Sequence, residues 1–369
     1  MTRITDSPID MQSSRTVVEP VTRAIARKLW AIVVAAIICC LAGGDAFGQA
    51  NRRIPVIFDT DICDDIDDTW ALALLLQSEE FDIRLITTAV GNTEAKAKVV
   101  AKFLQVVGRS DIPIGIGVQH HKGEHRQTGW AQGYDLASYP GKIHKDGVQA
   151  IIDTVTKSAT RTADESRRPM TIIAVGPLPN IAEALRREPK IADKVRFVGM
   201  HGSVRRGYGG SAQISAEYNV KAYPKDAQAV FTAGWDMTIT PLDTCGIVHL
   251  SGEKYKKVFE KNSPLTRVLM ENYRVWYKQG LLNDKKDLAG GELDKQVDQK
   301  VNSSSTTLFD TAAIYLAMSS DLVKIEQLPI KVTDDGYTRI EEGAKMVKCA
   351  TEWKDLGAFE DLLVTRLTK

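Results

Sequence analysis

Residues 56–72 read VIFDTDICDDIDDTWAL. The apolar residues 56–58 predict a buried strand, and the apolar run after Asp68 predicts a helix. Between them, six aspartates fall within ten residues, from Asp59 to Asp68. A turn needs one or two aspartates for capping, and six would repel one another strongly at the end of a core strand. A hard cation with oxygen ligands, Ca²⁺ or Mg²⁺, would relieve that repulsion, so the segment predicts a metal site.

The chain repeats this strand-then-helix pattern. Apolar strands and amphipathic helices are predicted to alternate over residues 83–89, 94–107, 112–116, 147–159, 170–175, 179–187, 195–198, 224–233 and 237–240. The alternation predicts an α/β fold with a Rossmann-like, mostly parallel sheet and helices on both of its faces. Ligands of such sheets bind beyond the carboxyl ends of the strands, which is where the aspartates fall.

The later part of the chain is predicted to be more helical. Helices are expected at 264–279 and 310–318 and near the C-terminus, with strands at 328–332 and 345–349. The polar stretch 284–305 is expected to be a loop. No linker separates a second domain, so residues 51–369 are expected to form one catalytic domain.

Residues 1–48 have the pattern of a secretory signal peptide. Arg23, Arg27 and Lys28 precede an apolar run at 29–41, and small residues follow at Ala46 and Gly48. The run is shorter than the about 20 residues that a membrane-spanning helix needs, although an uncleaved N-terminal anchor is the alternative. We therefore expect an exported protein, periplasmic or secreted, that is free of the membrane after cleavage.

Charge and cysteine content exclude two classes of function. The chain has 48 Lys and Arg against 47 Asp and Glu, so it carries no basic field that would bind nucleic acid. Beyond the signal segment the cysteines are Cys63, Cys245 and Cys349. Their scattered spacing matches neither a disulfide framework nor a cysteine metal site.

The acidic segment resembles the N-terminal signature of the inosine-uridine preferring nucleoside hydrolase family. That signature is usually Asp-Thr-Asp-Pro-Gly-x-Asp-Asp. Here Asp59-Thr-Asp61 and Asp67-Asp68 match it, with Ile62-Cys63 in place of Pro-Gly and two more residues before the final pair. Further segments resemble the family in the same order: TTAVGN at 87–92, IIAVGPLPN at 172–180, VGM at 198–200 leading to AEYN at 216–219, and LFD at 308–310.

The resemblance implies a Ca²⁺-dependent enzyme that hydrolyses the N-glycosidic bond of a ribonucleoside or related N-riboside. Asp61 would be the catalytic base, acting on a Ca²⁺-bound water. Carboxylates near the ring would stabilise the positive charge that develops on the sugar. The implied metal ligands are Asp61, Asp68, Asp310, the Val175 carbonyl and, as a further candidate, Asp65.

The implied substrate-binding residues are Asp67, Asn92, Met200, Glu217, Asn219 and Phe309. The partner would be a small nucleoside-like substrate, and the family is commonly a homo-oligomer, dimer or tetramer.

Phe309 bears on the leaving base. Inosine-uridine preferring members carry a histidine at this position, and Phe309 resembles the aromatic residue of purine-selective members. A phenyl ring cannot donate a proton, but it can stack on a base. We therefore expect a purine-like base, and a role in purine metabolism, with Trp130 or Trp276 as further stacking candidates.

Two other functions fit parts of the pattern. A strand ending in Asp-x-Asp also opens haloacid-dehalogenase-like phosphatases, in which Asp59 would be the nucleophile. A non-catalytic exported nucleoside-binding protein is the other alternative, because Ser211 and Phe309 depart from the family pattern. The exact base and sugar, and whether Asp65 or Asp68 is the closer metal ligand, stay open at this stage.

Overall fold

The computed structural model describes residues 53–120, 123, 125–160, 169–284 and 289–369. The predicted signal segment at 1–48 lies outside these residues. Among the described helices, none has the length and apolar character that crossing a membrane requires.

Ten strands form one sheet in the order β11-β10-β12-β7-β6-β5-β1-β2-β3-β4. Their bounds are β1 Ile54–Thr60, β2 Phe81–Thr88, β3 Ile114–Ile116, β4 Ile143–His144, β5 Met170–Ala174, β6 Val195–Met200, β7 Asp236–Thr240, β10 Val323–Val332, β11 Thr338–Ile340 and β12 Met346–Trp353. A separate antiparallel pair consists of β8 His249–Ser251 and β9 Ser304–Thr307.

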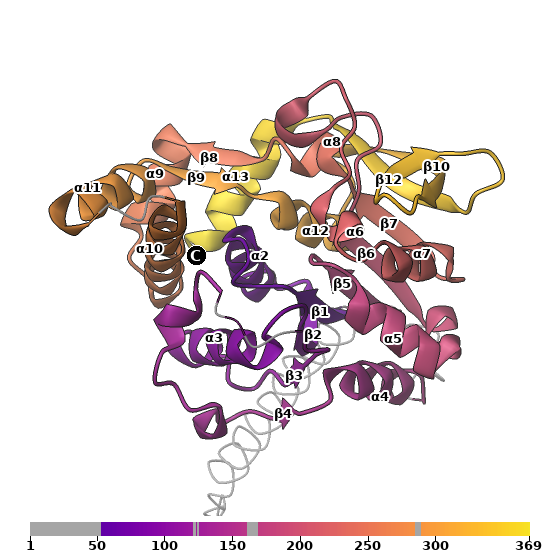
Figure 1. The fold of residues 1–369 in the computed structure, drawn as a ribbon, viewed down its shortest axis with the longest axis horizontal. Helices are drawn as coiled ribbons and strands as arrows, with labels where there is room; N and C mark the ends of the chain where they lie inside the picture. Colours follow the sequence, from indigo (N-terminus) through magenta and orange to yellow (C-terminus); the bar gives the residue numbers. More distant parts are fainter. Residues whose placement is uncertain (1–52, 121–122, 124, 161–168, 285–288) are drawn as a thin grey trace, which may run out of the picture. The chain divides into compact units, whose positions relative to one another are not determined.

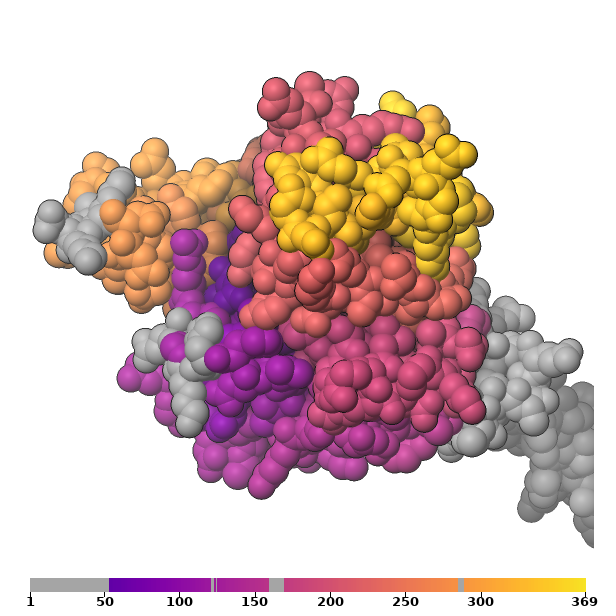
Figure 2. Space-filling view, turned by 45° about the vertical axis from the view of Figure 1, so that its right-hand side comes forward, coloured from indigo at the N-terminus to yellow at the C-terminus, as the bar shows by residue number. Residues whose placement is uncertain are grey.

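The sheet is parallel from β12 to β4, and β10 and β11 add an antiparallel edge. Figure 2 shows yellow C-terminal residues beside coral residues from the middle of the chain, with purple residues from nearer the N-terminus toward the opposite edge. The predicted α/β fold with a mostly parallel sheet is therefore confirmed.

Helices cover both faces of the sheet, with α2 and α3 on one side of the central strands and α4 and α5 on the other (Figure 1). The α-helices are α2 Asp67–Leu76, α3 Thr93–Val106, α4 Gly147–Thr160, α5 Pro179–Arg187, α6 Tyr218–Lys221, α7 Pro224–Thr232, α8 Leu242–Cys245, α9 Gly252–Glu260, α10 Pro264–Asp284, α11 Gly290–Val301, α12 Phe309–Met318 and α13 Leu356–Leu367. Short 3-10 turns lie at Thr128–Ala131, Leu136–Ser138, Pro189–Asp193 and Tyr208–Gly210.

Strand β1 is buried on both faces because its side chains alternate between two apolar clusters. Val56 and Phe58 pack with the helices α2 and α3, whereas Ile57 packs with α4, α5 and α7. This explains why the strand is continuously apolar. It also lies where the strand order reverses, with β2 on one side and β5 on the other. A crevice at such a point is where open α/β sheets bind ligands.

One predicted loop is a helix in the structure. Residues 284–305 were expected to be a loop because they are polar, but α11 occupies Gly290–Val301. Leu293, Val297 and Val301 recur every four residues and are all buried. Three apolar residues at this spacing form one stripe along a helix. The charged residues between them make the segment polar on average, so its composition alone predicts a loop.

We expect Leu293→Ala to destabilise the protein by about 2–3 kcal/mol, because it removes buried apolar volume from that stripe. The exposed Gln299, on the same helix, provides the matched control. Gln299→Ala should change the free energy of unfolding by less than about 0.5 kcal/mol. Urea denaturation of both variants measures the difference, and equal stability would show that α11 is not anchored by this stripe.

Candidate active site

The acidic turn after β1 is held by hydrogen bonds to residues from later segments of the chain. Asp59, at the end of the strand, is fully buried and accepts hydrogen bonds at Oδ1 from Thr87 Oγ1 (2.5 Å) and Asn180 Nδ2 (2.8 Å). Burial raises the pKa of Asp59 to about 6, although both hydrogen bonds act to lower it. Cys63 has a φ of 86°, and its N–H donates to Gln127 Oε1 at 3.1 Å. The turn is therefore fixed by contacts from three later segments.

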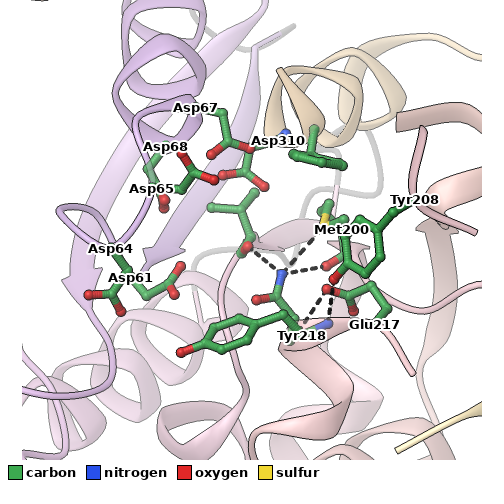
Figure 3. Close-up of a pocket in the computed structure, with 13 residues that line it drawn as sticks. Asp61, Asp64, Asp65, Asp67, Asp68, Met200, Tyr208, Glu217, Tyr218 and Asp310 are labelled. Carbon is green, nitrogen blue, oxygen red and sulfur yellow. Dashed lines mark hydrogen bonds between the residues drawn. The ribbon is translucent and has the colours of Figure 1, made fainter. Parts of the chain in front are cut away.

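Three carboxylates converge where this turn enters α2. One oxygen from each of Asp67, Asp68 and Asp310 lies within 4.8 Å of the other two, and all three residues are buried. Asp310 comes from the first turn of α12, and its N–H lies 3.3 Å from Asp67 Oδ2. Thr60 Oγ1 donates to Asp68. Residues far apart in the chain thus form one cluster (Figure 3).

The chemistry of this cluster fits a hard divalent cation. Burial raises the pKa of Asp67, Asp68 and Asp310 well above the ordinary range, and the neighbouring carboxylates raise it further. The hydrogen bonds that the described residues offer to Asp67 and Asp68 come from uncharged groups. Oxygen ligands in such an arrangement are the set that Ca²⁺ prefers. A cation bound there would compensate the buried negative charge of these carboxylates, which the surrounding protein groups do not neutralise.

The facing wall of the pocket is polar and rigid. Glu217 precedes α6, and its carboxylate accepts from the N–H groups of Gly202 (2.9 Å), Asn219 (2.7 Å) and Val220 (3.3 Å). Burial raises the pKa of Glu217 to about 7 against the effect of these hydrogen bonds. Asn219 Nδ2 donates to the carbonyls of Val175 (2.7 Å) and Met200 (3.0 Å). Both side chains are therefore held in place before any ligand binds.

Gly176 allows the end of β5 to approach the acidic turn. A Cβ at this position would lie 2.4 Å from Asp61 Oδ1, so any larger residue would displace the Asp61 carboxylate. Gly176 is in turn contacted by His201, whose Nε2 lies 3.0 Å from the Gly176 carbonyl. Burial lowers the pKa of His201 to about 4, so the imidazole is neutral at pH 7 and donates to this carbonyl. The Gly176 main chain is thus held by His201 as well as packed against Asp61.

These walls enclose a cavity of about 280 Å³. Figure 3 shows Asp65, Asp67, Asp68 and Asp310 grouped on one side, Asp61 beside Asp64, and Tyr208, Glu217 and Tyr218 across from them. Phe309 also lines the cavity, and its ring meets that of Tyr208 edge-on with 6.1 Å between centroids. The cavity therefore has a carboxylate wall, a hydrogen-bonding wall and an aromatic wall.

All but Asn92 of the predicted catalytic, metal-binding and substrate-binding residues line this cavity, and the further stacking candidates Trp130 and Trp276 do not. The predicted residues that line it are Asp61, Asp65, Asp67, Asp68, Val175, Met200, Glu217, Asn219, Phe309 and Asp310. Asp67, predicted to contact the sugar, shares the three-carboxylate cluster, whereas Asp61 faces the same cavity outside that cluster. Their individual roles stay predictions.

Asn92 is not among the residues that line the cavity. It caps α3, and its Oδ1 accepts from the Ala95 N–H at 3.1 Å. Trp130 and Trp276 are also absent from the lining: both are buried, and their indole N–H groups donate to Glu271 and to the Asp64 carbonyl. Neither tryptophan is therefore placed to stack on a base in this cavity.

Asp59 has no access to a ligand either. It is fully buried and is not one of the described residues that line the cavity. A phosphatase nucleophile must reach its substrate, so the haloacid-dehalogenase-like alternative is wrong. The carboxylate instead ties β1 to β2 and α5 through Thr87 and Asn180.

Three lining residues were not predicted: Asp64, Tyr208 and Tyr218. Asp64 is one of the clustered aspartates, and Tyr218 lies between Glu217 and Asn219. Both residues therefore lie inside the sequence motifs that predict the site. Tyr208 lies in a glycine-rich stretch, RRGYGG, that carries no sequence signal for a binding site.

The fold and the cavity define an α/β protein with a carboxylate cluster that could hold a cation at the carboxyl edge of a parallel sheet. The model of the inosine-uridine preferring nucleoside hydrolase family matches residues 56–359. The chain therefore belongs to this family, and it is a ribonucleoside N-glycosyl hydrolase.

Curated relatives agree with this assignment. The chain is 29% identical to the non-specific ribonucleoside hydrolase RihC of Klebsiella pneumoniae over 236 residues, which cover 60% of this chain and 73% of the relative. It is 30% identical to RihC of Salmonella paratyphi B over 238 residues, which cover 61% and 73%.

Solved structures share the fold. A plant nucleoside hydrolase has a TM-score of 0.67 at 22% identity and covers 85% of this chain and 99% of its own. A purine-preferring ribonucleoside hydrolase from Gardnerella vaginalis has a TM-score of 0.64 at 21% identity, with coverage of 85% and 98%. The predicted fold family is confirmed by these similarities.

Calcium should stabilise the protein more at pH 7.5 than at pH 5. Because the pKa values of Asp67, Asp68 and Asp310 are raised in the fold, the metal-free folded protein binds more protons than the unfolded chain, and its stability falls as pH rises through these values. Ca²⁺ binds the deprotonated form. At about 100 times its dissociation constant, Ca²⁺ should add about 2.7 kcal/mol.

Thermal unfolding of chelator-treated protein, with and without added Ca²⁺ at the two pH values, measures this effect. A Ca²⁺-induced increase in melting temperature that is the same at both pH values would contradict it.

Glu217→Gln should destabilise the fold by about 1–3 kcal/mol, since an amide NH₂ would face a backbone N–H that now donates to the carboxylate. The exposed Glu342 gives a control, Glu342→Gln, which should behave like the native protein. Urea denaturation compares the two variants. A native-like Glu217→Gln would mean that these N–H contacts do not hold the residue.

Proposed function

We propose that this nucleoside hydrolase cleaves ribonucleosides with a purine-like base, that it is Ca²⁺-dependent, and that Asp61 is its general base. The observation that carries the proposal is the arrangement of one cavity: the Asp67, Asp68 and Asp310 cluster stands across from the fixed pair Glu217 and Asn219. A cation site that faces rigid hydrogen-bonding groups suits a ligand with neighbouring hydroxyls.

Asp67, Asp68 and Asp310 would hold the cation, with Asp61 and the Val175 carbonyl as further ligands from the cavity wall. When bound, Ca²⁺ supplies a site that orients the sugar hydroxyls and lowers the pKa of water. In the metal-free protein, burial and the Asp68 charge raise the pKa of Asp61 well above its usual range. A nearby positive charge favours the carboxylate form, which a base requires.

The ribose hydroxyls would be held by Glu217 and Asn219. Both Glu217 oxygens already accept backbone N–H groups, and their remaining lone pairs can accept a hydroxyl proton. The Glu217 carboxylate would also face the sugar ring, where positive charge develops as the glycosidic bond breaks. Fixed negative groups stabilise that charge at no cost of reorganisation.

The aromatic wall would take the leaving base. Phe309 is half-buried, and Tyr208 and Tyr218 are 43% and 52% exposed, although both line the cavity. Large exposed aromatic side chains beside a polar pocket suit stacking on a planar heterocycle. Their area favours a purine over the smaller pyrimidine ring.

From the sequence we also propose that the chain is exported and assembles as a dimer or tetramer. Mass spectrometry of the exported protein identifies its N-terminus, and light scattering measures its mass. An N-terminus ahead of residue 48, or a monomer, would contradict the respective part.

We expect Asp61→Asn to lower kcat for inosine by at least about 10³-fold, because a general base and its alignment are lost together. Thermal unfolding should be close to native, since the amide keeps the shape of the side chain. Release of reducing sugar from a panel of nucleosides, with and without a chelator, measures the activity.

Native turnover in Asp61→Asn would remove Asp61 from the mechanism. Full activity in the chelator would remove the metal, and a complete lack of turnover in the native protein would favour a non-catalytic nucleoside-binding protein.

A further inference from the structure

Lys96 is a buried cation beneath the acidic turn. It lies on α3, and its side chain is 0% exposed. Its Nζ donates to the carbonyl of Asp61 (2.7 Å), to Asp64 Oδ2 (2.8 Å) and to the carbonyl of Ala89 (3.1 Å). An ammonium has three protons to donate, so every one of them is used. Lysine is almost never fully buried unless it is paired, which makes these contacts specific rather than incidental.

Two of the three contacts of Lys96 reach the same turn. One holds the main chain of Asp61, and the other holds the side chain of Asp64. The stretch between Asp61 and Asp67 is two residues longer than the usual family pattern, and Asp64 lies within it. A longer turn has more conformations available, so it needs additional contacts to keep Asp61 in one position.

Asp64 is fixed from a second direction. Its Oδ1 lies 2.5 Å from His125 Nδ1, and its carbonyl accepts from the Trp276 indole N–H at 3.1 Å. Burial raises the pKa of Asp64, but the hydrogen bond from His125 and the charge of Lys96 outweigh it and leave the pKa below its usual value. Lys96 Nζ and Asp64 Oδ2 lie 2.8 Å apart and form an ion pair of low exposure.

The acidic cluster thus divides into two parts with different compensation. Asp67, Asp68 and Asp310 form the group that suits an exchangeable cation. The turn at Asp61 and Asp64 has a permanent cation from the protein itself. A resident ammonium cannot leave or shift with the ligand, so it keeps the turn in one geometry.

We propose that Lys96 is a positioning residue that aims the Asp61 carboxylate into the cavity by holding the Asp61 carbonyl and the Asp64 side chain together. This rests on the proposed role of Asp61 as the base. The competing explanation is that Lys96 only neutralises Asp64. The two explanations make different predictions for a protein in which residue 64 is uncharged. Lys96 should still affect kcat there if it positions Asp61, and should not if it only neutralises Asp64.

The test compares Lys96→Met/Asp64→Asn with Asp64→Asn alone, using inosine as the substrate and saturating Ca²⁺. The double variant removes both members of the Lys96–Asp64 ion pair together, and the amide oxygen at position 64 can still accept from His125. We expect kcat of the double variant to be at least about tenfold below that of Asp64→Asn, because a small misplacement of a base is costly. KM should stay within about threefold, since Lys96 makes no contact with Glu217 or Asn219.

A kcat of the double variant equal to that of Asp64→Asn would overturn the proposal, because neutralisation would then be the whole role of Lys96. The control is Lys98→Met, the matched change at a half-buried lysine two residues further along α3. If it lowered kcat as much as the double variant does, the proposal would also be overturned. A merely structural role would lower the melting temperature in proportion to activity. We expect instead a melting temperature close to that of Asp64→Asn.

Lys96→Arg is the second variant, and it keeps the test decisive if the double variant does not fold. It retains the positive charge, but a guanidinium cannot place one nitrogen at all three acceptors. We expect a lower kcat with little change in KM, whereas native kcat would overturn the proposal. Asp61→Asn separates the two hypotheses: native turnover there rejects Asp61 as the base, whatever the Lys96 variants show.

Discussion

The structure depends on negative charge that is buried at the carboxyl end of β1. Two unit charges 4 Å apart repel by about 4 kcal/mol at the effective dielectric constant of a protein surface, and by more in the interior. Asp67, Asp68 and Asp310 meet within 4.8 Å, and Asp61 shares their cavity. Such an arrangement survives only if protons, an ammonium or a metal ion supply positive charge. The surrounding fold can be understood as the scaffold that holds these groups against their repulsion.

The parallel sheet is suited to that task because both of its faces are packed. Val56 and Phe58 anchor β1 to one apolar cluster and Ile57 anchors it to the other, so the strand cannot move away from the charge that follows it. Asp59 adds polar ties to β2 and α5. Gly176 then lets β5 come close enough to bound the cavity. Rigid supports of this kind let an active site keep like charges together.

Much of this could be predicted because the decisive signals are local. Alternating apolar strands and helices gave the fold class, and the ordered motifs placed Asp310 near Asp68 although 242 positions separate them in the numbering. The misses have physical reasons. The stripe of Leu293, Val297 and Val301 is masked by charged neighbours. Tyr208 lines the cavity because of the conformation of its loop, which no sequence motif indicates. Lys96 looks like a solvent-exposed lysine, because its partners come from a turn that precedes it by more than thirty residues.

In the proposed mechanism the two parts of the cluster have different tasks, and each uses its own kind of positive charge. The Asp61 turn must keep one geometry through every catalytic cycle, and a lysine held by three hydrogen bonds meets that requirement. In the proposed mechanism, the Asp67, Asp68 and Asp310 group would instead act on a ligand that enters and leaves, and a metal ion can change its coordination while a lysine cannot. A second lysine at that position would supply one positive charge against the two of Ca²⁺, and it would fill the space proposed for the sugar hydroxyls. On this proposal the site is explained by the distribution between a fixed and an exchangeable cation, and charge balance alone does not explain it.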